Sequence, residues 1–431
     1  MNLRFLPFFA GLLIAFTAVA QRPIPAKPQS APILILGATA HLGNGQTIAN
    51  SAIGFENGKI TLVADATTIR LDRTKYSKIF DASGKHVYPG FIALNTRLGL
   101  VEIDAARPTV DFSDVGAYNP NLRALVAYNT DSDVIPTIRS NGILLAQSTP
   151  EGGTMSGTSS VVQLDAWNWE DAAFRADDGH WLNWPAIRTS GGFGSGTPEA
   201  RNNDQYGKNI EEILRFFEEA KAYAAQTAPE VKNLKFEAMK GLFSQKQALY
   251  IRVGNVKAIQ DAVLFAKNFG FRTVVVGGED SWMIADFLKT NNVSVVLAPP
   301  QSLPGRDDDD VDQPYKTAAQ LHDKGVTFTV TSIGGWRQRN LPFQVGQVCG
   351  FGLPKEAAVS AITLNAAKIL GIDAACGSLE TGKDATLFIS EGDALDMRTC
   401  IVTAAFIQGR EINLDNKHKQ LSKRFEEKYK Q

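Results

Sequence analysis

The residues most able to do chemistry stand where apolar runs of the sequence end. Asn95 and Arg97 follow the run PGFIAL, in the stretch PGFIALNTRLGL. A guanidinium is charged at every workable pH and can hold a carboxylate through two parallel hydrogen bonds. Three carboxylates, Glu151, Asp165 and Asp280, also lie near predicted strand ends, where they could work as an acid and base pair. The pattern predicts either anion binding at Arg97 or acid-base chemistry by carboxylates.

Histidine and cysteine are too few and too scattered to predict a zinc site. The histidines are His41, His86, His180, His322 and His418, and no two of them stand two or four positions apart. The cysteines are Cys349, Cys376 and Cys400, without a C-x-x-C pair. We interpret the cysteines as buried apolar residues, with one disulfide open as an alternative. A metal held by carboxylates alone would be magnesium, calcium or manganese.

Two kinds of element must position these residues. Strand-like runs joined by turns lie near both ends of the chain, among them QTIANSAIGFENGKITLVAD and CIVTAAFIQGREI. Between them, β-branched runs such as LYIRVG and FRTVVVGG alternate with helical patterns such as NIEEILRFFEEAKAYAAQ. Strands alternating with helices predict a (β/α)8 barrel. We expect the α/β class, with a TIM-type barrel over 89–372, a small β-sandwich domain built from 21–88 and 373–415, and a charged tail over 416–431.

The N-terminal stretch MNLRFLPFFAGLLIAFTAVA predicts a secretory signal peptide over residues 1–20. One basic residue, Arg4, precedes an apolar run that closes on Ala18, Val19 and Ala20, the pattern of a cleavage site. A membrane anchor is the weaker alternative, because the run carries a proline and is shorter than the roughly 20 residues that a span needs. We expect an exported protein, periplasmic or extracellular, without a membrane span once the leader is removed.

Composition bears on which partners the chain can bind. Its 44 basic and 45 acidic residues give a formal net charge of −1, and the leader removes one further basic residue. This balance gives no indication of a nucleic-acid partner or an anionic membrane. Four tryptophans fall close together in sequence, namely Trp167, Trp169, Trp181 and Trp184. They could form a stacking wall for a peptide or sugar, or pack an inserted loop.

Two longer stretches carry a family resemblance. One is DASGKHVYPGFIALNTRLGL at 81–100, and the other is FGLPKEAAVSAITLNAAKILGIDAACGSLETGKDATLFIS at 351–390. They resemble the entry into the barrel and the last barrel helix of the amidohydrolase superfamily, in particular its imidazolonepropionase-like branch. The resemblance implies a barrel of the metal-dependent hydrolase kind, acting on carbon-nitrogen bonds other than peptide bonds. It also implies one or two divalent metals, often zinc, at the C-terminal mouth of the barrel.

Carried over onto this sequence, the metal ligands of that family are absent. In chain order, the matching positions are Asn95 and Arg97 for the first-strand H-x-H pair, Gly254 for the fifth strand, Gly277 or Gly278 for the sixth, and Thr331 or Ser332 for the eighth. Without a metal, neither the activated water nor the Lewis acid of such a hydrolase is available. We therefore expect no cofactor, although zinc or another divalent metal is the family norm.

Two functional hypotheses follow. The leading one is an exported member of the family that lacks the metal centre, and that binds a small molecule or peptide or serves as a partner subunit. A homo-oligomer, or a hetero-oligomer with a metal-competent relative, belongs to this hypothesis. The alternative is an active hydrolase of amide or cyclic amide bonds that uses Glu151, Asp165 and Asp280 or non-standard ligands. Convergent carboxylates at the former metal position would favour the enzyme, whereas Arg97 there would favour binding.

Overall fold

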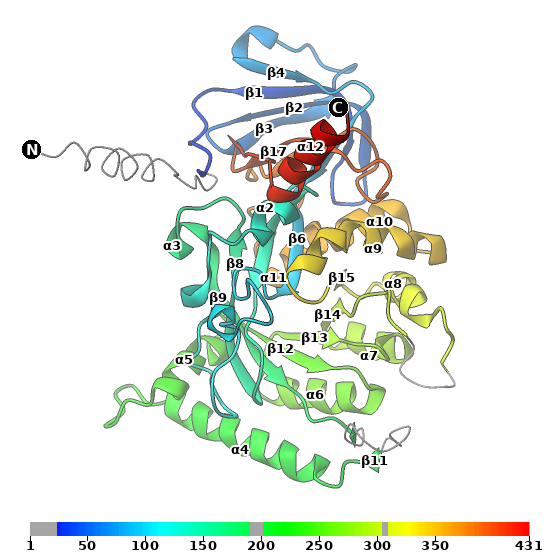
Figure 1. Cartoon of the computed structure of the whole chain (residues 1–431). Coiled ribbons are helices and arrows are strands. Elements are labelled where there is room, and N and C mark those ends of the chain that lie inside the picture. Colours follow the sequence, from blue (N-terminus) through cyan, green and yellow to red (C-terminus); the bar gives the residue numbers. More distant parts are fainter. Residues whose placement is uncertain (1–23, 190–200, 304–308, 431) are drawn as a thin grey trace, which may run out of the picture.

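The computed structural model describes residues 24–189, 201–303 and 309–430. The predicted signal peptide, 1–20, lies outside the described residues. Figure 1 shows two sheets in the chain, one at the top built from both ends of the sequence and one below it built from the middle. The two ends of the chain thus meet in one small domain, as the strand-like runs predicted.

The small domain is an eight-stranded sheet in the order β18-β17-β16-β5-β1-β2-β3, with β4 beside β1. Its strands are β1 Ile33–His41, β2 Thr47–Glu56, β3 Lys59–Asp65, β4 Lys78–Asp81, β5 His86–Pro89, β16 Leu387–Ser390, β17 Val402–Ile407 and β18 Arg410–Glu411. The predicted turn ENGK joins β2 to β3, with Asn57 and Gly58 at positive φ as a tight hairpin requires. β5 pairs with β16, which ties the N-terminal strands to the C-terminal ones.

The second sheet curls into a nearly closed barrel of eight strands in the order β15-β14-β13-β12-β9-β8-β7-β6. These are β6 Phe91–Thr96, β7 Ile143–Ser148, β8 Met155–Gln163, β9 Ala173–Asn183, β12 Ala248–Val253, β13 Thr273–Gly277, β14 Ser294–Leu297 and β15 Phe328–Val330. A separate two-stranded sheet pairs β10 Arg188–Thr189 with β11 Arg201–Asn202. At the seam of the barrel, Thr331 Oγ1 donates to the carbonyl oxygen of Leu94 at 2.7 Å. The predicted TIM-type barrel is confirmed.

One barrel strand runs against the others. β8 is antiparallel to both β7 and β9, whereas the remaining neighbours pair in parallel. The connection from β7 to β8, residues 149–154, is too short for the helix that a parallel crossover needs, so the chain has to return in the opposite direction. The barrel therefore departs from eight identical strand-helix repeats at this point.

Helices cover the outside of the barrel. They are α2 Val134–Arg139, α3 Trp169–Ala172, α4 Tyr206–Ala224, α5 Leu234–Phe243, α6 Val256–Asn268, α7 Ala285–Thr290, α8 Gln313–Asp323, α9 Leu341–Val348, α10 Lys355–Ala361 and α11 Leu364–Leu370, followed at the C-terminus by α12 Lys417–Tyr429. Strand side chains alternate between two cores, as on β12, where Leu249 and Ile251 pack with α4, α5 and α6 while Ala248 and Tyr250 face the barrel interior. This alternation decides which residues reach the centre of the barrel.

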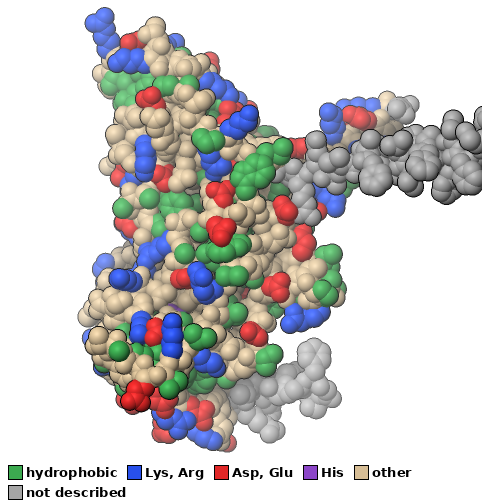
Figure 2. All heavy atoms as spheres, turned by 90° about the vertical axis from the view of Figure 1, so that its left-hand side faces the viewer, with side chains coloured by type: hydrophobic (Ala, Val, Ile, Leu, Met, Phe, Trp, Pro, Cys, Tyr) green, Lys and Arg blue, Asp and Glu red, His purple; other side chains and the backbone are tan. Residues whose placement is uncertain are grey.

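The remaining sequence predictions on organisation have mixed outcomes. All three cysteines lie in the described part of the chain and none forms a disulfide. The stretch predicted as a charged tail, 416–431, folds mostly as α12, and its side chains there are exposed. Within the described residues, no helix combines the length and the apolar character that crossing a membrane takes. Basic and acidic side chains are interspersed on the face shown in Figure 2, as the balanced composition suggests.

Candidate functional site at the barrel mouth

A guanidinium occupies the mouth of the barrel. Arg252 lies on β12, two residues after the inward-facing Tyr250, and its planar group stacks over the Trp181 ring at 4.4 Å. It donates to the carbonyl oxygen of Pro150 at 3.0 Å and to Asn183 Oδ1 at 3.2 Å, and lies 3.4 Å from Asn95 Oδ1. All these partners are neutral. Burial lowers the pKa of Arg252 to about 10, a decrease that the nearby Glu151 partly opposes.

Arg97 and Glu151 form a second charged group at the same end of the barrel. Arg97 Nε donates to Glu151 Oε1 at 2.8 Å, and its Nη2 donates to the other carboxylate oxygen, so the pair is bidentate. The guanidinium also stacks over the Phe112 ring at 4.2 Å. The hydrogen bonds that Arg97 donates to Glu151 raise the pKa of Arg97, whose positive charge is therefore permanent. Arg97 is thus charge-compensated, whereas none of the described carboxylates is hydrogen-bonded to Arg252.

Asn95 connects the mouth to a polar network beneath it. Its backbone takes the left-handed conformation, with φ of 52°, which asparagine tolerates better than most residues. The backbone nitrogen of Asn95 donates to Gln147 Oε1 at 3.3 Å, and Gln147 Nε2 donates to Asp178 Oδ2 at 2.8 Å. Tyr250 and Ser159 donate to the same carboxyl group at 2.7 Å each. Burial raises the pKa of Asp178, and the three donors oppose that shift.

The former metal-ligand positions have different surroundings. Asn95 and Arg97 lie at the C-terminal end of β6. Gly254 directly follows β12, the strand that carries Arg252. A Cβ atom at Gly254 would lie 2.0 Å from Glu279 Oε2. Gly278, at φ of 59°, packs against Val295. Thr331 closes the seam of the barrel, and Ser332 Oγ donates to the carbonyl oxygen of Arg337 at 3.0 Å.

The three candidate carboxylates do not converge. Glu151 follows β7 and lies at the mouth, paired with Arg97. Asp165 follows β8, and because β8 is antiparallel, this residue lies at the opposite end of the barrel. There it accepts from Arg139 at 2.8 Å and from Arg410 of the small domain at 3.1 Å. Asp280 Oδ2 accepts from the backbone nitrogen of Val256 at 2.9 Å, at the start of α6. The direction of β8 therefore separates Asp165 from the other two candidates.

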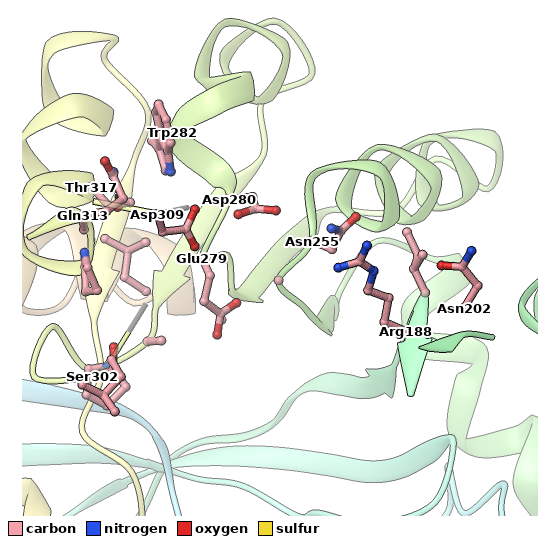
Figure 3. Close-up of a pocket in the computed structure, with 18 residues that line it drawn as sticks. Arg188, Asn202, Asn255, Glu279, Asp280, Trp282, Ser302, Asp309, Gln313 and Thr317 are labelled. Atoms are coloured by element: carbon pink, nitrogen blue, oxygen red, sulfur yellow. Dashed lines mark hydrogen bonds between the residues drawn. The ribbon is translucent and has the colours of Figure 1, made fainter. Parts of the chain in front are cut away.

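Two adjoining cavities open at this end of the barrel. The smaller, of about 350 Å³, is lined by Arg252, Trp184 and Arg188 among others. The larger, of about 850 Å³, is bounded by the ends of β12, β13 and β14. Figure 3 shows Arg188 and Asn255 on one side of the larger cavity and Glu279, Asp280 and Trp282 on the other. Asp280 thus faces a cavity, although away from Glu151.

Comparison with known proteins agrees with this architecture. The profile of the amidohydrolase family matches residues 322–412. An amidohydrolase from Thermotoga maritima superposes with a TM-score of 0.75 at 21% identity, covering 88% of this chain and 99% of the other. The chain therefore has the amidohydrolase fold.

Other solved structures share the amidohydrolase fold at lower similarity. A molinate hydrolase superposes with a TM-score of 0.53 at 15% identity, over 90% of this chain and 95% of the other. An adenosine deaminase from Xanthomonas campestris with bound zinc gives 0.53 at 14% identity, over 92% and 98%. No curated protein matches the sequence.

The residues at the mouth of this barrel do not fit a divalent metal. Within the described residues, no group of three or more histidine, cysteine, aspartate or glutamate side chains is arranged to hold one. Arg252 places a positive charge beside Asn95, and this charge would repel a cation. The sixth- and eighth-strand positions offer no carboxylate or imidazole.

Sequence reasoning missed Arg252, a charged residue with neutral hydrogen-bond partners at the mouth. Arg252 is the one charged residue within the apolar run LYIRV, a signal that could have identified it. The tryptophan wall does not form. Trp181 is fully buried beneath Arg252, whereas Trp167 is 65% exposed on the surface. Of the other two tryptophans, Trp184 lines the smaller cavity and Trp169 does not.

Proposed function

We propose that this protein is an exported, metal-independent binding protein, whose barrel mouth holds an anionic group of a small molecule or peptide on Arg252. The observation that carries the proposal is the guanidinium of Arg252, enclosed at the centre of the mouth with neutral hydrogen-bond partners alone. Within the described residues no carboxylate is ion-paired with it. A carboxylate or phosphate entering the adjoining cavity would compensate this charge where water is largely excluded.

The arrangement favours binding over hydrolysis. The family chemistry requires an activated water and a Lewis acid, and the donors for the required metal are replaced by Asn95, Arg97 and glycines. Glu151 accepts two hydrogen bonds from Arg97, so both of its carboxylate oxygens are already engaged. Hydrolysis of an amide or cyclic amide bond by unconventional carboxylates remains the alternative, and the larger cavity does hold Glu279 and Asp280.

The test combines metal analysis with binding of an anionic probe to the mature protein. We expect less than about 0.1 equivalent of metal after expression in supplemented medium, and binding of N-acetylated dipeptides that the Arg252→Gln variant loses by about tenfold or more. The control is Glu211→Gln on the exposed face of α4, which should bind as the wild type does. One or two equivalents of tightly bound metal, lost on substitution of Glu151, would overturn the proposal. So would the appearance of cleaved product in the same samples.

Export and association complete the proposal. Export is supported by the leader-like residues 1–20, and the N-terminus of protein recovered outside the cytoplasm should then be Gln21. Pairing with a second copy, or with a metal-competent relative, would give a barrel without a metal centre a role through its surface. A monomer by light scattering, both alone and after purification from its native host, would remove the partner role and leave the ligand-binding role standing.

A further inference from the structure

The C-terminal helix α12 lies on the outside of the molecule (Figure 1). It contacts the rest of the chain at its first turn, where Lys417 Nζ lies 3.7 Å from Asp133 Oδ2 and the His418 ring lies 5.5 Å from the Trp336 ring. The structure describes every residue of α12, and none of them is buried. The later turns of the helix are therefore accessible to a partner from outside the chain.

Three apolar side chains form a stripe along this helix. Leu421, Phe425 and Tyr429 are spaced four residues apart, so they lie on one face of α12. Their exposed fractions are 38%, 51% and 78%, so the stripe becomes more exposed towards the end of the helix. Trp336, which packs on His418 one turn before Leu421, is itself exposed and extends the same surface. The fold thus leaves the apolar face of an amphipathic helix in water, which is typical of an interaction surface.

Basic side chains border this stripe. α12 holds five basic and two acidic residues, a net charge of +3, although the net charge of the whole chain is −1. Arg424 and Lys428 follow Leu421 by three and seven residues, so they lie directly beside the stripe. Arg337 and Arg339 are exposed on the 3₁₀ helix before α9, near the start of α12. The balanced composition of the chain therefore conceals a local excess of positive charge.

The size and composition of this surface favour one kind of partner. A stable protein interface needs roughly 800 Å² on each side, more than three side chains offer, and a second copy would bring two net charges of +3 together. A nucleic acid would use the basic residues and leave the apolar stripe in water. An anionic lipid bilayer suits both, because its headgroups attract lysine and arginine while its acyl region accepts leucine and phenylalanine.

We propose that α12 attaches this protein to the surface of an anionic membrane, with the helix lying in the plane of the headgroups. Leu421 and Phe425 enter the boundary of the acyl chains, and Tyr429 stays at the level of the headgroups. Arg424 and Lys428 pair with the lipid phosphates. The helix does not cross the bilayer, so the attachment is reversible and is weakened by salt. This inference goes beyond the proposed function, because it concerns a surface other than the barrel mouth.

The experiment measures co-sedimentation of the mature protein with lipid vesicles. The protein begins at Gln21, so that the apolar leader takes no part in the binding. One set of vesicles contains phosphatidylcholine alone, and the other also contains about 30 mol% phosphatidylglycerol. We expect at least about tenfold stronger binding to the anionic vesicles, most of it lost when the salt concentration rises from about 0.1 to 0.5 M. Equal binding to both sets, or binding to neither, would overturn the proposal.

A matched pair of variants tests the apolar stripe. Leu421→Ser should weaken binding to the anionic vesicles by about fivefold or more. Leu214→Ser on α4 is the control, since both leucines are 38% exposed, and it should bind as the wild type does. In Phe425→Trp, vesicles with bromine-labelled acyl chains should quench the added fluorescence. If the two serine variants bind alike, or if the added tryptophan is not quenched, the stripe does not enter the bilayer and the proposal fails.

A second pair of variants tests the charges. The double variant Arg424→Gln and Lys428→Gln should weaken binding to the anionic vesicles by about tenfold or more. The double variant Lys208→Gln and Arg215→Gln removes the same charge from the exposed face of α4 and should bind as the wild type does. An equal loss in both would indicate a general effect of net charge and contradict the assignment to α12.

The same variants distinguish a membrane from a second copy of the chain. A dimer in light scattering that Leu421→Ser separates, without binding to vesicles, would identify the second copy as the partner and overturn the proposal. None of the substituted side chains is buried, so every variant should fold. Circular dichroism and thermal unfolding check this for each variant.

Discussion

Two buried titratable residues on β9 show how burial controls charge in this barrel. Asp178 and His180 are both fully buried. His180 Nε2 lies 3.0 Å from the carbonyl oxygen of Ala238, and its Nδ1 has no hydrogen-bond partner among the described residues. Burial lowers the pKa of His180 to about 4, whereas burial raises the pKa of Asp178. Both residues are therefore driven towards their neutral forms, and their contributions to stability change with pH in opposite directions.

At the residue scale, His180 should make the fold sensitive to acid. Its pKa is lower in the folded chain than the unfolded value of about 6.5, so the unfolded chain binds the proton more readily. The contribution is fully present above about pH 6.5 and should decrease by up to about 3 kcal/mol as the pH falls towards 4. Chemical unfolding between pH 4 and 7 measures it. His180→Gln should show a smaller decrease than the wild type, while the exposed His322→Gln should match the wild type. Equal slopes for all three proteins would contradict this account.

At the element scale, β8 depends on close contact with the loop that contains Leu122. Gly157 has φ of 126°, and a Cβ atom there would lie 2.5 Å from the carbonyl oxygen of Leu122. That carbonyl accepts from the backbone nitrogen of Thr158 at 2.8 Å, so the loop is fixed along the strand. A glycine is required here both for its backbone conformation and for the space.

Gly157→Ala should therefore lower the free energy of unfolding by about 1 to 3 kcal/mol, because the new methyl group clashes with a carbonyl held in place by β8. Urea unfolding measures the change. The matched control is Gly207→Ala in α4, where nothing lies within 4 Å of the added Cβ. The control should be neutral or slightly stabilising, since alanine favours helix more than glycine does. An unchanged midpoint for Gly157→Ala would show that the loop can move away.

At the scale of the whole molecule, Asp165 joins the barrel to the small domain. It accepts from Arg139 at the end of α2 and from Arg410 on β18, and its Oδ2 also accepts from the backbone nitrogen of Ala26 at 2.9 Å. Arg139 and Asp165 are nearly inaccessible, with side-chain exposures of 4% and 2%. The carboxylate therefore compensates two guanidinium groups at the domain interface, which explains its presence without a catalytic role.

Asp165→Asn should destabilise the protein by about 3 to 5 kcal/mol, because it leaves buried positive charge without its counter-ion. The midpoint of urea unfolding measures this change, and Asp310→Asn is the control, since the Asp310 pair with Lys316 is exposed. Ligand binding by folded Asp165→Asn should equal that of the wild type, because the residue lies at the far end of the barrel from Arg252. If Asp165→Asn had normal stability but did not bind the ligand, Asp165 would instead belong to the binding site.

The order of strands and helices and the missing metal donors could be predicted from the sequence. β12 and β13 are short apolar runs because both of their faces are buried, and the absence of ligands at Asn95, Arg97 and Gly254 is a matter of residue identity alone. Periodicity and composition are local properties, so they can be recognised without knowledge of the fold. The sequence by itself thus determined the frame of the barrel and the chemistry that its mouth lacks.

Only the tertiary structure decided which charged residues meet. The reversal of β8 carries Asp165 away from Glu151, and the left-handed backbone of Asn95 turns its side chain towards Arg252. The place of Glu279 against Gly254 likewise depends on the neighbouring strand. These contacts join residues distant in sequence, and they depend on strand direction and backbone conformation, which side-chain types at single positions do not specify.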